Sequence, residues 1–141
     1  PREAAVAGSI VFSSSTVGSL VIRYTYVWTS DAAGVVSGIS HDLIHGAVVA
    51  ATFSPGAGGV QPTNLYDVAL RCDQHDVDVL NEEGLDKSST AGSHHSIYSY
   101  NAAKGIFFRQ FVHGGGYTLG VTNAGASKQG TMEIYVSHGV L

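Results

Sequence analysis

The chain has 141 residues, of which 13% are charged, and 7 lysines and arginines against 11 aspartates and glutamates give a net charge of −4. This length suits one domain that can bury a core without the help of disulfide bonds or metal ions. So few basic residues provide no positive surface for a phosphate backbone, and nucleic acid is not expected as a partner. Because Cys72 is the single cysteine and no apolar run is long enough to cross a bilayer, we expect a soluble protein without internal disulfides.

The first nine residues differ from the rest of the chain. Residues 1–9 lack the alternation of a strand, whereas the rest of the chain shows no second change of composition. We therefore expect an N-terminal arm over residues 1–9 and one domain over residues 10–141. Such an arm can reach a neighbouring subunit, and its candidate contact residues are Pro1, Arg2 and Glu3.

A long strand is predicted between Val17 and Ser30, where large apolar side chains alternate with polar ones. One face of this strand carries Leu20, Ile22, Tyr24, Tyr26 and Trp28. A stripe of this kind is more typical of a core than of a sugar-binding platform, so Trp28 is expected to be buried. Residues 30–34 have the composition of a turn, and a second antiparallel strand is expected from Val35.

The remainder of the chain consists of short predicted strands with turns between them. They are predicted at Ala47–Phe53, Leu65–Cys72, Val77–Leu80, Ile97–Tyr100, Gly105–Val112, Tyr117–Thr122 and Thr131–Val136. Residues 54–59 combine Pro and Gly and are predicted to form a loop. About eight strands with frequent turn signals indicate an all-β fold, and we expect an antiparallel two-sheet β-sandwich of the jelly-roll type.

The most polar window, Asn81–Ser96, is predicted to be a long surface loop that orders only against a partner. It contains two glutamates and two adjacent histidines. Its candidate contact residues are Glu82, Glu83, His94 and His95.

No catalytic, cofactor or metal site is predicted. His41 and His45 are four apart, but their surroundings are strand-like, and residues at that spacing on a strand lie about 13 Å apart. The acidic run over residues 73–78 lacks the spacing of a calcium loop and is better explained as a solvated hairpin. Cys72 is expected to be a small buried side chain. A metal-dependent enzyme remains an alternative, with ligands drawn from the scattered histidines His41, His45, His75, His94, His95 and His113.

Five segments in order along the chain resemble a group of small virion structural proteins of tailed bacteriophages. The shared pattern is W-T-S-D-A-x-G, a P-G loop, P-T-x-x-Y-D, D-V-L, and N-A-G-x-x-x-x-G. In this chain these segments are Trp28–Gly34, Pro55–Gly56, Pro62–Asp67, Asp78–Leu80 and Asn123–Gly130. The chain departs from the pattern before D-V-L, where it has D-Q-H-D in place of an acidic turn with glycine, and in the histidines of the polar window.

The resemblance implies a non-enzymatic particle component. Among such components, small β-sandwich proteins often serve as cement or decoration on the capsid, so the implied partners are the major capsid protein and further copies of the chain, in a homodimer or homotrimer. The implied location is the capsid surface, after synthesis in the host cytoplasm, without a nucleic acid or membrane partner. Two alternatives stay open at this point: a tail, baseplate or adaptor component, and a carbohydrate-binding β-sandwich module.

Overall fold

The computed structural model describes residues 6–97, 99–101, 106–108, 110–112 and 115–138. Within them the chain forms strands and one short 3₁₀ turn, η1 (Gly58–Val60), and no helix that is long and apolar enough to cross a membrane. The strands are β1 (Ser9–Val17), β2 (Val21–Thr29), β3 (Ser40–Leu43), β4 (Gly46–Pro55), β5 (Asp67–Cys72), β6 (Ser93–Ser96), β7 (Ser99–Asn101), β8 (Ile106–Phe108), β9 (Gln110–Val112), β10 (Gly115–Thr122) and β11 (Gln129–Ser137).

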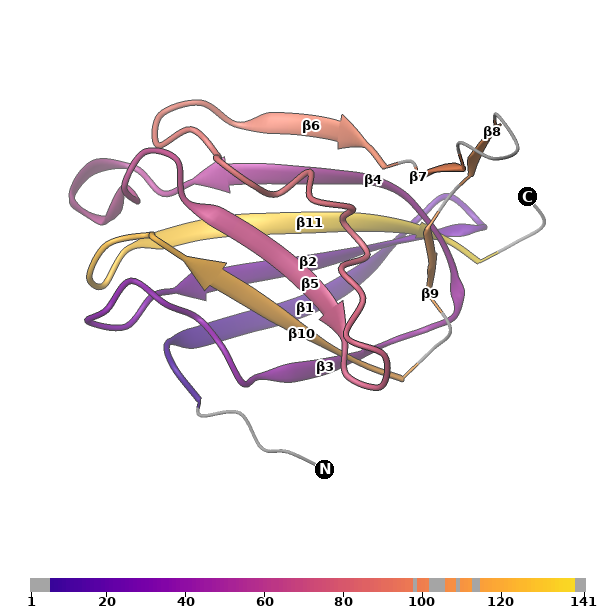
Figure 1. The fold of residues 1–141 in the computed structure, drawn as a ribbon, viewed down its shortest axis with the longest axis horizontal. Helices are drawn as coiled ribbons and strands as arrows, with labels where there is room; N and C mark the ends of the chain where they lie inside the picture. The colour runs from indigo at the N-terminus through magenta and orange to yellow at the C-terminus, as the bar shows by residue number, and fades with distance from the viewer. Residues whose placement is uncertain (1–5, 98, 102–105, 109, 113–114, 139–141) are drawn as a thin grey trace.

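All of these strands except β7 and β8 form two antiparallel sheets packed face to face, so the predicted all-β sandwich is confirmed (Figure 1). The larger sheet has the order β1-β2-β11-β4-β6. The start of β4, before the residues that pair with β6, pairs with β9. The smaller sheet has the order β3-β10-β5. A separate hairpin of β7 and β8 projects from one end of the sandwich.

The strand pairings are nested in the manner of a jelly roll. The innermost pair in sequence is β5 with the segment just after it, through the bridge between Arg71 and Asp78. Moving outward along the chain, β4 pairs with β6, β3 with β10, and β2 with β11. Successive pairs lie in alternate sheets, which is what results when one long antiparallel ribbon is wrapped around a core. The predicted jelly-roll-like topology therefore follows from the observed register.

The core lies between the sheets and is formed by the alternating side chains of the predicted strands. Tyr24, Tyr26 and Trp28 of β2 are buried, and Trp28 is only 1% exposed. The stripe is thus core, as predicted, and it cannot serve as a sugar-binding platform. Leu20 differs from the prediction: it is 49% exposed, because the strand begins at Val21 and the preceding residues form the turn from β1.

Two features at the N-terminal side of β2 were not predicted. β1 is a complete strand paired with β2 along its whole length, although its Ser-rich sequence gives weak alternation. Before it, Ala7 and Ser37 exchange backbone hydrogen bonds of 3.0 and 2.9 Å, so the chain is attached to the sandwich from Ala7 onward. Residues 1–5 of the predicted arm lie outside the described residues.

The strand predicted to pair with β2 from Val35 does not do so. The turn itself is as predicted: Asp31 accepts hydrogen bonds from the amides of Ala33 and Val35, and Gly34 has φ +80°. After this turn, however, Val36 bridges to Val121 of β10 in the other sheet. Both edges of β2 are already occupied, by β1 and β11, so the chain crosses over rather than forming a hairpin.

The polar window 81–96 is a loop, as predicted, over residues 81–92, but it ends in a strand that was not predicted. Lys87 within the window is buried and bridges to Tyr66. Its last four residues form β6, which pairs with β4 at the edge of the larger sheet. The chain's own backbone therefore orders this segment.

The other differences concern the ends of elements. β4 extends to Pro55 and is followed by η1, where only a loop was expected. Gly115 and Gly116 begin β10 rather than forming a turn, and the strand expected over residues 105–112 is divided into β8 and β9. The segment Val77–Leu80 makes a single bridge to β5 before it turns away.

Candidate interaction surfaces

The structure describes four of the seven predicted contact residues and places two of them, Glu83 and His95, in contact. Pro1, Arg2 and Glu3 lie outside the described residues. Glu83 and His95 are in contact, and His94 and Glu82 flank them on exposed positions. These four residues form the region around β6, at the opposite edge of the larger sheet from β1.

His95 connects two charged side chains across this region. Its Nδ1 lies 3.1 Å from Glu83 Oε1, and its Nε2 lies 2.9 Å from Lys87 Nζ. The Lys87 ammonium also lies 4.9 Å from the centre of the Phe53 ring, and that ring meets the His95 imidazole at 5.7 Å. With Nδ1 donating to Glu83, Nε2 can accept a hydrogen bond from Lys87, so one imidazole joins the carboxylate to the ammonium.

Lys87 is the buried member of this cluster, at 8% exposure. Burial lowers the pKa of its ammonium, and the carboxylates of Glu83 and Asp86 oppose that shift. Sequence reasoning missed this residue because a lone lysine in a polar window has no periodic signal. Its role is to fasten the 81–87 segment to β4 and β6.

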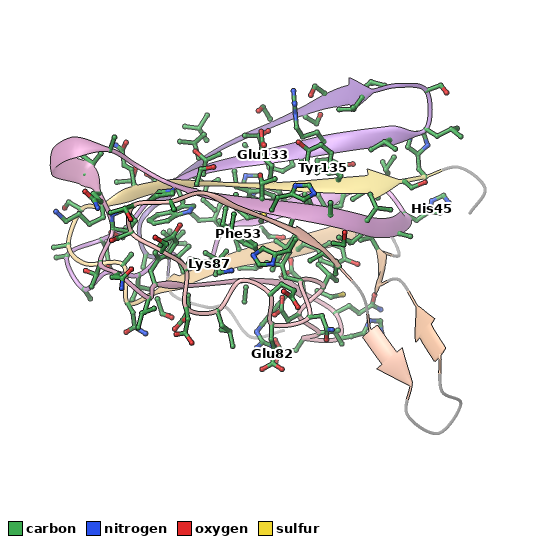
Figure 2. All side chains as sticks on the ribbon, turned by 90° about the horizontal axis from the view of Figure 1, so that it is seen from above. His45, Phe53, Glu82, Lys87, Glu133 and Tyr135 are labelled. Atoms are coloured by element: carbon green, nitrogen blue, oxygen red, sulfur yellow. The ribbon has the colours of Figure 1, made fainter. Side chains whose placement is uncertain are left out.

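A second surface is the outward face of the larger sheet, which we call the outer face. The registers place one side chain from each of five strands in a row across it: Ser13, Thr25, Glu133, Thr52 and His94. Figure 2 shows Glu133 and Tyr135 on this side of the sheet and Phe53 and Lys87 on the opposite side. The row is broad and consists mainly of short hydroxyl side chains.

Glu133 is held at the centre of the outer face by its neighbours. Thr52 donates a hydrogen bond of 3.1 Å to one carboxylate oxygen and Thr25 donates one of 3.3 Å to the other. Arg23 Nε lies 3.8 Å from the same carboxylate, and its guanidinium donates to Ser15 at 3.1 Å. This fixed carboxylate was not singled out from the sequence, although its outward position in β11 follows from the alternation there.

The segments that carry the phage-protein resemblance converge at one end of the sandwich. Gly130 lies directly opposite Trp28 in the β2–β11 register, and the Tyr66 ring packs against the indole with 5.6 Å between the ring centres. Ser30 donates a hydrogen bond of 2.6 Å to the carbonyl of Gly125, and the amide of Thr63 donates one of 2.9 Å to the carbonyl of Ala124. Three of the five motifs thus contact one another at this end of the sandwich.

The acidic residues of the 73–78 turn are engaged within the chain. The Asp73 carboxylate accepts hydrogen bonds from the hydroxyls of Ser40 and Thr118. The Asp78 carboxylate accepts from the amides of Leu70 and Leu80, at 3.2 and 3.0 Å, and from a third amide in the following turn. The D-V-L motif is therefore a capped turn rather than part of a regular strand.

The remaining histidines and the cysteine are dispersed. In the parts of the chain that the structure describes, no three His, Cys, Asp or Glu side chains are placed to hold a metal ion; His113 lies outside those parts. Cys72 is buried as predicted, with its Sγ 3.8 Å from Nδ1 of His75. His41 stacks on Phe12 at 4.1 Å, and burial lowers the pKa of its imidazole, while Asp42 acts in the opposite direction.

Comparison with known proteins gives no assignment. No family model, no curated protein and no solved structure matches this chain.

Proposed function

We propose that this protein is a non-enzymatic virion component of a tailed bacteriophage, and that it acts as a cement or decoration protein on the major capsid protein. The observation that carries the proposal is the convergence of the resembling motifs. Individually each motif is an ordinary strand or turn, but W-T-S-D-A-x-G, P-T-x-x-Y-D and N-A-G-x-x-x-x-G contact one another around Trp28. Because the three motifs contact one another, their occurrence together has a structural cause, and it is less readily produced by chance than three unrelated turns.

The outer face is the surface we assign to the capsid. It spans five strands, and most of its side chains are short, so another protein can approach the sheet closely. Binding there would stabilise the assembled shell, since a ligand that binds only the assembled state lowers its free energy. The jelly roll also supports the proposal, because it is an architecture found in viral particles.

The first test is the copy number of the protein in purified particles of the phage that encodes it. Mass spectrometry calibrated against the major capsid protein is expected to find hundreds of copies per particle, released with the shell rather than with the tail. Some dozens of copies that fractionate with tails would indicate a tail, baseplate or adaptor component instead. Absence from the particles would refute the proposal.

The second test locates the binding surface with a matched pair of substitutions. Thr131→Lys places a charge on the outer face in the central strand β11, and Thr122→Lys places the same charge at the end of the central strand β10 of the other sheet. We expect T131K to reduce binding to undecorated capsids at least tenfold and T122K to leave it unchanged. Equal effects would argue against the outer face.

A further inference from the structure

One edge of the larger sheet is long and unprotected. β1 pairs only with β2 among the described strands, so its other side presents unpaired backbone groups. Natural proteins normally protect such an edge with a charge, a proline, a bulge or a very short strand. β1 has none of these protections: it has nine residues, no charged residue, no proline and an uninterrupted register with β2. The opposite edge, β6, has only four residues.

We propose that β1 pairs antiparallel with β1 of a second copy of this chain, joining the two larger sheets into one continuous sheet across a two-fold axis. This inference does not rest on the proposed function, because it concerns the isolated protein.

The direction of the free backbone groups follows from the neighbouring strand. The amide of Ser30 donates to the carbonyl of Lys128 at 2.8 Å, on the β11 side of β2. Backbone groups of successive strand residues point to opposite sides, so even-numbered residues of β2 face β11 and odd-numbered ones face β1. In the β1–β2 register odd residues pair with odd residues. The free amides and carbonyls of β1 therefore belong to its even-numbered residues Ile10, Phe12, Ser14 and Thr16.

Self-pairing uses all of these groups at once when the two-fold axis passes through Ser13. In that register Phe12 faces Ser14 of the second copy and Ile10 faces Thr16, and these are the pairs that exchange hydrogen bonds. Ser13 faces its own counterpart. A charged residue near the axis would face itself and be repelled; β1 has no charged side chain, so this register has no like-charge contact within the strand.

The exposed side chains of β1 also fit this register. On the outer face Val11 is 70% exposed and Val17 is 42% exposed, at opposite ends of the strand. The proposed register places each of them beside a small serine of the second copy, Ser15 and Ser9 respectively. Exposed apolar surface is thereby covered without a clash, whereas a monomer leaves it in water.

A backbone test separates edge pairing from other modes of association. Ser14→Pro removes an amide that faces away from β2, so the β1–β2 ladder keeps its hydrogen bonds. Two hydrogen bonds are lost per dimer by symmetry, and we expect the dimer dissociation constant to rise by roughly thirtyfold. Ser14→Ala keeps the amide and serves as the control. Sedimentation equilibrium should give a dimer for the wild type and S14A, and a weaker dimer for S14P.

A disulfide test examines the register. Ser13→Cys places two thiols at a position opposite itself, where Cα atoms of a non-hydrogen-bonded pair lie about 4.5 Å apart, within disulfide range. Val11→Cys is the control: it is highly exposed, but in this register two Val11 residues lie four positions apart along the strands. The native Cys72 is buried. Under mild oxidation S13C should form a covalent dimer and V11C should not.

Three results would overturn the proposal. They are a monomer at all concentrations with no S13C crosslink, a dimer that S14P leaves unchanged, and crosslinking of V11C as fast as that of S13C. A pure monomer would also point to a strand of another protein as the occupant of this edge. None of these results depends on whether the chain is found in virions, so the function and the self-pairing can fail separately.

Discussion

Replacing Gly130 with alanine is expected to strain the contact at which the resembling motifs meet. Gly130 lies in β11 directly opposite Trp28 in β2, and the indole covers it. A Cβ on Gly130 would lie 2.3 Å from Cζ2 and 2.7 Å from Cε2 of the Trp28 ring. Carbon atoms normally approach to about 3.5 Å, so the ring would have to move by about 1 Å.

The indole has little room for that movement. Trp28 is 1% exposed, and Tyr66 packs against it at 5.6 Å, so a shift would be passed on to the core. Overpacking of a rigid core typically costs about 1–3 kcal/mol, and we place G130A at the upper end, about 3 kcal/mol. For a domain of this length that corresponds to a fall of about 10 °C in Tm.

The matched control is Gly120→Ala in β10, where an added Cβ would meet no atom within 4 Å. G120A is expected to be neutral or to stabilise by a few tenths of a kcal/mol, because it restricts the unfolded chain. Urea denaturation followed by far-UV circular dichroism measures both variants. In a Trp28→Phe background the smaller ring should reduce the cost of G130A. A wild-type midpoint for G130A, or an equal loss in G120A, would refute the packing argument.

Three further predictions concern polar contacts. Asp78→Ala removes the acceptor for the amides of Leu70 and Leu80, so its unfolding free energy should fall by about 2 kcal/mol in urea denaturation, and Asp78→Asn should fall less. Asp31→Ala removes the acceptor of the turn after β2 and should cost about 1 kcal/mol by the same assay, whereas an unchanged midpoint would contradict the turn assignment. The pKa of Lys87 is lowered in the folded protein, so just below the usual value of 10.5 the unfolded chain binds more protons than the folded one. The stability of the wild type relative to Lys87→Met should therefore rise from pH 7 towards pH 10. A difference in Tm that stays constant with pH would show that the ammonium is not desolvated.

Much of the fold could be predicted because burial on one side of a sheet leaves a period of two in the sequence. Trp28 and its neighbours in β2 follow that period, and all three aromatic residues are buried as expected. The turn at Asp31 was equally predictable, because an aspartate followed three residues later by a glycine is typical of a turn. Both signals are local, and local signals identify strands and turns without saying which strands pair.

The errors arose where the partner of a segment is distant in sequence. β1 has three successive serines, and its strand character comes from pairing with β2 rather than from its own composition. β6 is a strand because β4 offers it an edge, and Val36 joins β10 because β2 has no free edge. The contact between His95 and Lys87 has the same origin, since β6 brings the imidazole to the buried ammonium. In each case a non-local pairing decided the conformation.

The nested pairing also explains why both proposed surfaces exist only in the complete fold. β11 is the last strand in the chain, yet it lies between β2 and β4 at the centre of the larger sheet. The outer face therefore forms only when the end of the chain has joined its beginning, and Glu133 at its centre gains its hydroxyl partners from β2 and β4 in the same step. The edge of β1 likewise becomes a regular template only when β2 is held in place from its other side. In a jelly roll with this strand order, long loops must close before those contacts form. The entropy lost in closing them favours slow folding. Binding at either surface would then be selective for the folded chain and would stabilise it.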